Sequence, residues 1–223
     1  MTAPSEGTAS KVSNQKKKQG IDKVLIGVVV LLIIAVLGVV GVTVRSVIFK
    51  PKAPRSEAER DLYKYQTLVK KDAKDLEARL NLATAYYDMK EPNKAIKELK
   101  KILKTKPKWA PARYNLAMVY LNQDQTEEGI KELKKIIEVH PRHELAYYQL
   151  GQVYTDKKDY KKAIEAFKKT LEITPEAADV HYSLGLAYEK DGQPDLAKKE
   201  YKSTLVYIPD HKEAKANLKR LGE

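Results

Sequence analysis

The sequence predicts an all-α protein in which a single transmembrane helix precedes a solenoid of helical hairpins. Two features lead to this prediction: an uncharged apolar run over residues 24–44, and a 34-residue period that continues from residue 76 to residue 211. Within each period, apolar residues recur at i and i+4, the spacing that gathers side chains on one face of a helix.

The composition limits the classes of function. The chain has 223 residues, and its 42 basic against 30 acidic side chains give a net charge of +12. Hydrophobic residues make up 43% of it, enough for a packed core. It contains no cysteine, which excludes disulfides, thiolate catalysis and cysteine-ligated zinc.

The N-terminal part reads as a tail followed by a membrane anchor. Residues 1–23 are polar and basic, so we expect a flexible tail. Residues 24–44 carry no charge, and at about 1.5 Å per residue such a helix spans the roughly 30 Å hydrocarbon layer. A cleavable signal peptide is the alternative, but its apolar core is usually about 7 to 15 residues long. Residues 45–55, with two prolines, are predicted to form a juxtamembrane linker.

The charges beside the apolar run predict the orientation. Within about 15 residues of it, five basic residues precede the run and four follow it. The compact lysine cluster on the short tail favours a cytoplasmic tail, which places the C-terminal region outside the cytoplasm of a single-pass cell-membrane protein. The basic residues after the run are also suited to attract anionic lipid headgroups, an acidic protein or another polyanion.

The period is visible as columns of equivalent residues. One column is entirely leucine, the next is always small, a third is always tyrosine, and a last is always proline. These columns are Leu82, Leu116, Leu150 and Leu184; Ala83, Ala117, Gly151 and Gly185; Tyr86, Tyr120, Tyr154 and Tyr188; and Pro107, Pro141, Pro175 and Pro209. The units are 76–109, 110–143, 144–177 and 178–211.

This order of residues at a 34-residue period resembles the tetratricopeptide repeat family. The resemblance implies helix-turn-helix units that stack into a right-handed superhelix, an α-solenoid. The first two units depart from the family pattern, because they have alanine in place of glycine and, at Leu99 and Leu133, leucine in place of an aromatic residue.

Turn and cap signals place the helix ends. Asp159 is a predicted N-cap, Gly192 suits a left-handed turn, and Pro92 and Pro194 suit the first helical position. Residues 56–75 are predicted to be an N-terminal capping half-repeat, with four apolar residues available to pack on the first unit. Residues 212–223 are predicted to form a C-terminal capping helix.

The resemblance implies that the first helices line a concave groove that binds peptide or protein partners. The candidate groove residues are Leu80, Asn81, Thr84, Tyr87, Tyr114, Asn115, Met118, Leu121, Tyr148, Gln149, Gln152, Tyr182 and Leu186. Aromatic side chains with a polar tip suit such interfaces, and amides bond a peptide backbone. The alternative is that these residues pack adjacent first helices together. Leu80 and Thr84 stand where one subclass of the family has the lysine and asparagine that hold a C-terminal carboxylate, so that clamp is not expected.

No pattern points to catalysis. We find no nucleophile motif or phosphate loop, and the four histidines have no ordered companions for a metal site. No cofactor, metal or nucleic acid is expected. The sequence therefore predicts a non-enzymatic, membrane-anchored scaffold or chaperone-like adaptor that binds a peptide or protein in its groove. The alternative is a structural subunit that assembles through its convex face, solenoid ends or transmembrane helix; the oligomeric state stays open.

Overall fold

The computed structural model describes residues 28, 31, 32, 34–36 and 56–222. The chain divides into two units, one ending at Ala53 and the other beginning at Pro54. In the first unit the described residues are helical and exposed. The predicted tail 1–23 and linker 45–55 lie outside the described residues, as does most of the predicted transmembrane segment 24–44. None of the helices that the structure describes is long and apolar enough to cross a membrane.

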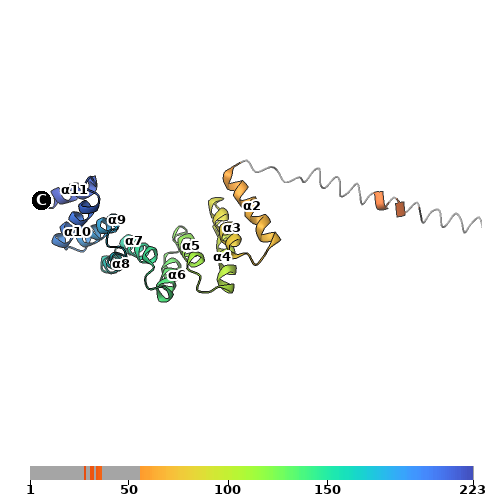
Figure 1. Ribbon diagram of the computed structural model, residues 1–223, viewed down its shortest axis with the longest axis horizontal. Coiled ribbons are helices and arrows are strands. Elements are labelled where there is room, and N and C mark those ends of the chain that lie inside the picture. Colours follow the sequence, from red (N-terminus) through yellow and green to blue (C-terminus); the bar gives the residue numbers. More distant parts are fainter. Residues whose placement is uncertain (1–27, 29–30, 33, 37–55, 223) are drawn as a thin grey trace, which may run out of the picture. The chain divides into compact units, whose positions relative to one another are not determined.

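The second unit is all α-helical over its described residues 56–222, and its helices follow one another in sequence order as antiparallel pairs (Figure 1). Its ten helices are α2 (Glu57–Lys71), α3 (Leu76–Asp88), α4 (Pro92–Thr105), α5 (Ala110–Leu121), α6 (Thr126–Val139), α7 (Glu144–Asp156), α8 (Tyr160–Ile173), α9 (Ala178–Lys190), α10 (Pro194–Tyr207) and α11 (Lys212–Arg220). We call α3, α5, α7 and α9 the first helices of the four hairpins, and α4, α6, α8 and α10 the second helices. The predicted all-α solenoid is confirmed.

The structure confirms the turn and cap positions that were predicted for individual residues. The Asp159 side chain accepts a hydrogen bond from the backbone N–H of Lys162, 3.3 Å away. Pro92 and Pro194 are the first residues of their helices. Gly192 takes φ of 78°, and the equivalent turns use non-glycine residues with φ near 60°: Lys90, Asp124 and Lys158.

An apolar seam joins the two helices of each hairpin. In the third hairpin, a Cβ added to Gly151 would come within 2.5 Å of the Phe167 ring, so glycine is what lets the buried ring reach this position. Gly185 and Tyr201 make the same arrangement in the fourth hairpin. In the first two hairpins, alanine stands opposite a buried leucine instead: Ala83 and Leu99, then Ala117 and Leu133.

A polar seam runs parallel to the apolar one. In the first hairpin, Arg79 contacts the Glu98 carboxylate at 2.6 Å and donates to the Ala73 carbonyl at 2.7 Å, which ties α3 to α4 and to the preceding loop. Lys101 also reaches Glu98, at 2.7 Å. Because Glu98 is buried, these partners offset the cost of removing its charge from water. The second hairpin repeats the contacts of Arg79 with Glu98 and the Ala73 carbonyl: Arg113 contacts Glu132 and the Pro107 carbonyl. In the fourth hairpin His181 contacts Glu200 and the Pro175 carbonyl.

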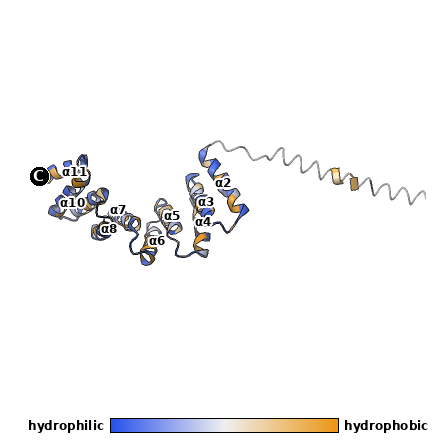
Figure 2. Ribbon diagram, viewed as in Figure 1, coloured by the Kyte–Doolittle hydropathy of each residue, from blue (hydrophilic) through white to orange (hydrophobic). Residues whose placement is uncertain are grey.

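Two single helices cover the ends of the repeat array. Helix α2 begins with a capping box between Ser56 and Glu59, and it packs on α3 with Leu62, Tyr65 and Val69 half-buried. Leu68, the fourth residue expected to pack, is instead 39% exposed. At the other end α11 buries Ala214 and Leu218 against α10. Both helices combine hydrophilic and hydrophobic residues (Figure 2), as expected of amphipathic helices that cap the ends of a repeat array.

Candidate functional site

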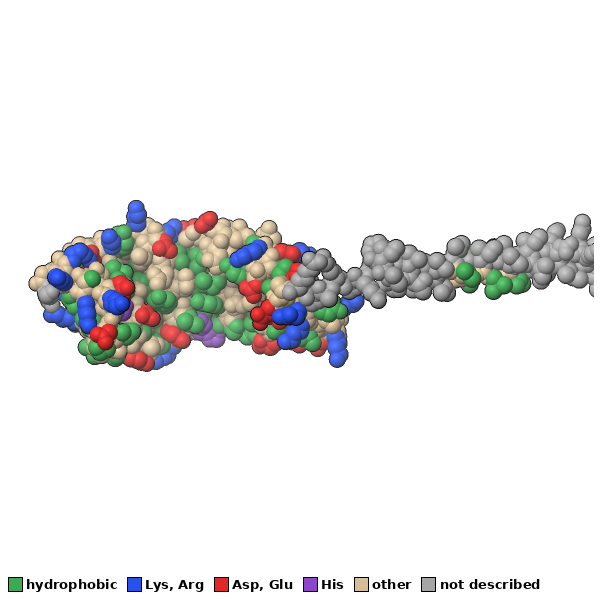
Figure 3. Space-filling model, turned by 90° about the horizontal axis from the view of Figure 1, so that it is seen from above, with side chains coloured by type: hydrophobic (Ala, Val, Ile, Leu, Met, Phe, Trp, Pro, Cys, Tyr) green, Lys and Arg blue, Asp and Glu red, His purple; other side chains and the backbone are tan. Residues whose placement is uncertain are grey.

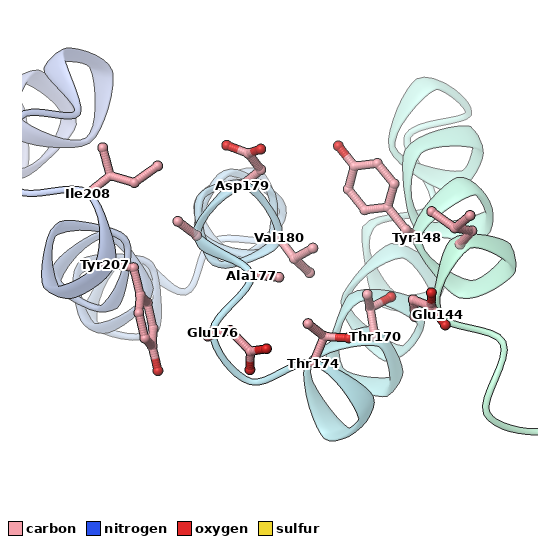
Figure 4. Close-up of a pocket in the computed structure, with 12 residues that line it drawn as sticks. Glu144, Tyr148, Thr170, Thr174, Glu176, Ala177, Asp179, Val180, Tyr207 and Ile208 are labelled. Atoms are coloured by element: carbon pink, nitrogen blue, oxygen red, sulfur yellow. The ribbon is translucent and has the colours of Figure 1, made fainter.

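One opening that involves a predicted groove residue, Tyr148, lies beside α7 and α9. This α7–α9 cavity has a volume of about 620 Å³. Its walls include Leu145 and Tyr148 of α7, Thr174 of the loop after α8, Val180 of α9, and Tyr207 at the end of α10. In Figure 4, Tyr148 and Val180 face each other across the opening. The cavity therefore joins side chains from two neighbouring hairpins.

The rim of the α7–α9 cavity is acidic although the protein is basic. Three carboxylates line it, from Glu144, Glu176 and Asp179, and no lysine or arginine does. Apolar side chains lie open to solvent among them: Leu145 is 51% exposed and Tyr207 is 46% exposed. An apolar hollow with carboxylates at its edge favours a ligand that has an apolar group next to a positive charge.

Tyr148 is held from two sides. Its ring lies 6.0 Å from the buried Phe167 ring, and its hydroxyl accepts a hydrogen bond of 2.7 Å from Gln152. Burial raises the pKa of the neighbouring Tyr114, and Tyr148 raises it further. Tyr148 is therefore partly a packing residue, yet its remaining surface lines the cavity.

The equivalent tyrosines pack against histidines at the start of the next helix. Tyr114 stacks on His143 with ring centroids 6.2 Å apart, and Tyr182 lies 4.7 Å from His211. Each of these histidines caps the next helix by accepting a backbone N–H at its Nδ1 atom. These two tyrosines support the interpretation that the fifth position of each unit packs adjacent first helices.

Four other predicted groove residues meet in a smaller hollow. Thr84 and Tyr87 of α3 and Asn115 and Met118 of α5 line a cavity of about 120 Å³. Its size suits a single small apolar group rather than an anchor side chain. These residues form a continuous surface across the first two hairpins.

The remaining predicted groove residues divide between core and surface. Leu80 packs against the core of the first two hairpins, which includes Leu99; Leu121 lies directly against Gly129; and Leu186 packs against the core that contains Tyr201 and Leu218. Asn81 is exposed and Gln149 is partly exposed. The amides are thus accessible, whereas the leucines contribute mainly to packing.

Sequence reasoning missed most of the wall of the α7–α9 cavity. Leu145, Glu176, Asp179, Tyr207 and Ile208 all line it, and none was a candidate. One signal was available: Leu145 is an exposed leucine in a column that otherwise holds Glu77, Pro111 and Asp179. Tyr207 and Ile208 come just before Pro209, at the end of a second helix, whereas the predicted groove residues all lie on first helices.

The histidines have structural contacts. Besides the two N-caps, His140 lies 3.4 Å from the Lys108 carbonyl and His181 contacts Glu200 at 2.7 Å. Over the described residues no group of three or more histidine and acidic side chains is placed to hold a metal ion.

The two sets of helices differ in charge. The first helices contain one lysine between them, Lys190, whereas each second helix contains at least three. Figure 3 shows hydrophobic side chains gathered over the middle of one face, with charged side chains toward its ends. The scaffold therefore presents surfaces of different chemistry.

Comparisons with known proteins agree with this architecture. A model described as "TPR repeat" matches residues 151–192, and one described as "Anaphase-promoting complex, cyclosome, subunit 3" matches residues 61–136. A search of curated proteins found no match.

Solved structures give a longer match. The structure titled "Crystal structure of MamA" is 32% identical, with a TM-score of 0.62, over 72% of this chain and 98% of that one. "MamA 41-end from Desulfovibrio magneticus RS-1" is 21% identical with a TM-score of 0.62, over 77% and 94% of the two chains. "YrrB: a TPR protein with an unusual peptide-binding site" is 21% identical with a TM-score of 0.60, over 73% and 84%. The chain belongs to the tetratricopeptide repeat family.

Proposed function

We propose that this protein is a membrane-anchored scaffold that holds an extended peptide segment of a partner protein along its first helices. The α7–α9 cavity is the observation that carries the proposal, because it is an open, largely apolar hollow lined by the predicted groove residue Tyr148. Aromatic and apolar anchors in such hollows contribute most of the binding energy at protein interfaces. A related fold in YrrB is described as having a peptide-binding site.

The cavity chemistry selects the partner segment. An apolar side chain of the segment enters the hollow beside Leu145 and Tyr148, while a neighbouring lysine or arginine meets Glu176 and Asp179. Accessible amides, the exposed Asn81 and the partly exposed Gln149, hydrogen bond to the segment's backbone and set its direction. This account involves no covalent step, so the proposed function is binding alone.

The apolar run 24–44 supports the proposed anchor, and the lysine cluster before it supports a cytoplasmic tail. The solenoid then lies outside the cytoplasm, close to the bilayer. Alkaline extraction of membranes tests the anchor: we expect the full chain to stay in the pellet and a variant lacking residues 24–44 to be released. Protease treatment of intact cells, compared with inverted vesicles, tests the orientation, and digestion of the solenoid only in inverted vesicles would contradict it.

Photocrosslinking from the full chain in its native membrane tests the groove. A photoreactive amino acid at position 145, which is exposed, is compared with one at position 168, an exposed lysine of α8 outside the cavity. We expect a protein adduct from position 145 and none of the same mass from position 168. Adducts from position 168 alone would contradict groove binding and favour the assembly-subunit alternative.

A further inference from the structure

The third hairpin breaks the polar seam that the other three share. At the position of Arg79, Arg113 and His181 it has Tyr147, and at the position of the buried glutamates it has Ala166. The other three hairpins fill this region with an arginine or histidine that contacts the glutamate carboxylate and also contacts a backbone carbonyl of the preceding loop. In the third hairpin the carboxylate and its arginine or histidine partner are both replaced, and the alanine side chain is much smaller than the glutamate.

A second cavity lies at this break. The α6–α8 cavity has a volume of about 290 Å³, and both Tyr147 and Ala166 line it. Ile137 of α6 and Leu150 of α7 add apolar surface. It shares no lining residue with the α7–α9 cavity, so the two are separate sites.

The charge on the α6–α8 cavity is opposite to that on the α7–α9 cavity. Lys134, Lys162 and Lys169 line it, and Glu165 is the carboxylate among its lining residues. Lys169 contacts Glu172 at 2.7 Å, and Lys162 contacts Asp159; both pairs are largely exposed. Exposed ion pairs contribute little to stability, so carboxylates of a partner can replace Asp159 and Glu172 as the contacts of these lysines at a small cost in free energy.

We propose that the α6–α8 cavity is a second docking site, which takes an acidic peptide segment and holds one of its apolar or aromatic side chains against Tyr147 and Ala166. The apolar side chain fills the space that the missing ion pair leaves, and acidic neighbours of that side chain meet the three lysines. The proposal rests on the break in the repeat and on the charge of the rim, and it is independent of the groove function proposed above.

Fluorescence anisotropy on the full chain in neutral-lipid nanodiscs tests the proposal. The probe is a fluorescein-labelled peptide, Asp-Glu-Phe-Glu-Asp, compared with a twin that has alanine in place of phenylalanine. We expect the phenylalanine peptide to bind about tenfold more tightly than its twin, and both affinities to fall as salt rises. Equal affinities would overturn the proposal, because a lysine-rich surface alone would then explain the binding.

A variant that restores the pattern of the other hairpins provides the decisive control. Tyr147→Arg with Ala166→Glu places the ion pair in the cavity and leaves the net charge of the chain unchanged. We expect it to unfold at the same or a higher temperature than the parent and to lose about tenfold in affinity for the phenylalanine peptide. Ala166→Leu fills the cavity without adding charge, and we expect the same loss if the double variant does not fold.

Tight binding of the peptide by a folded variant with a filled cavity would overturn the proposal. Leu145→Asp, which alters the other cavity, separates the two sites. We expect it to leave the affinity for the acidic peptide unchanged, and a large loss would show that the peptide occupies the groove instead.

Discussion

The first two and the last two hairpins fill the same internal space in different ways. Ala117 faces Leu133 in the second hairpin, whereas Gly151 faces the Phe167 ring in the third. The hairpin with the larger residue in one helix has the smaller residue opposite it, because the interior is close-packed and tolerates neither a void nor an overlap. The repeat therefore preserves the total volume of the pair rather than the identity of either residue.

The largest effect should come from breaking this volume match in the third hairpin. We expect Gly151→Ala to lower the free energy of unfolding by about 3 kcal/mol, because the new Cβ would meet the Phe167 ring at 2.5 Å. Ala117→Gly in the second hairpin, which creates no overlap, should cost only about 1 kcal/mol. Chemical denaturation followed by circular dichroism measures both.

A second substitution sharpens the result. Phe167→Leu, added to Gly151→Ala, converts the third seam into the alanine–leucine version that the second hairpin uses. We expect the double variant to recover most of the lost stability. A double variant no more stable than Gly151→Ala alone would contradict the volume argument.

The polar seam gives the second comparison and an effect of intermediate size. Arg113→Met leaves the buried Glu132 with Lys135 as its remaining ion-pair partner and leaves the Pro107 carbonyl without its donor. We expect a loss of about 2 kcal/mol. Tyr147→Met, at the equivalent position in the third hairpin, breaks no ion pair and should cost less than about 1 kcal/mol. Similar losses in the two variants would show that the ion pair is unimportant.

These comparisons explain how far the sequence predicted the fold. Each hairpin contacts mainly its neighbours, so the interactions that define one unit recur 34 residues later and appear as columns. Caps and turns are local, and Asp159 and Gly192 were predicted correctly for that reason. The face of its helix on which a side chain lies could therefore be predicted from the 34-residue period.

The surface was harder to predict because it depends on contacts between units. Tyr114 and Tyr148 occupy the same column, but Tyr114 stacks on His143 and Tyr148 opens into a cavity. The difference depends on residues of the next hairpin, including Val180 and Tyr207. No single column of the repeat contains this information.

The smallest effect concerns the C-terminal cap. The Arg220 guanidinium, by hydrogen bonding to Glu189, holds the pKa of that carboxyl below its usual range, and Tyr201 donates to it as well. A lowered pKa contributes stability above the unfolded pKa of about 4.3, and this contribution disappears as pH falls through the folded value. Glu189→Gln should therefore be slightly less stable than the parent at pH 7, and the difference should shrink as the pH falls below the unfolded pKa and disappear below the folded one. A difference that grows in acid would contradict this assignment.

The acidic rim of the α7–α9 cavity provides the most direct test of the central claim, that this cavity is the partner site. The measurement is the yield of protein adduct from a photoreactive residue at position 145 in native membranes. Glu176→Lys with Asp179→Lys reverses the rim, and Glu128→Lys with Glu138→Lys makes the same charge change at exposed positions of α6 outside the cavity. We expect the rim variant to lose about tenfold in yield and the α6 variant to match the parent. Equal yields from both variants would contradict the account.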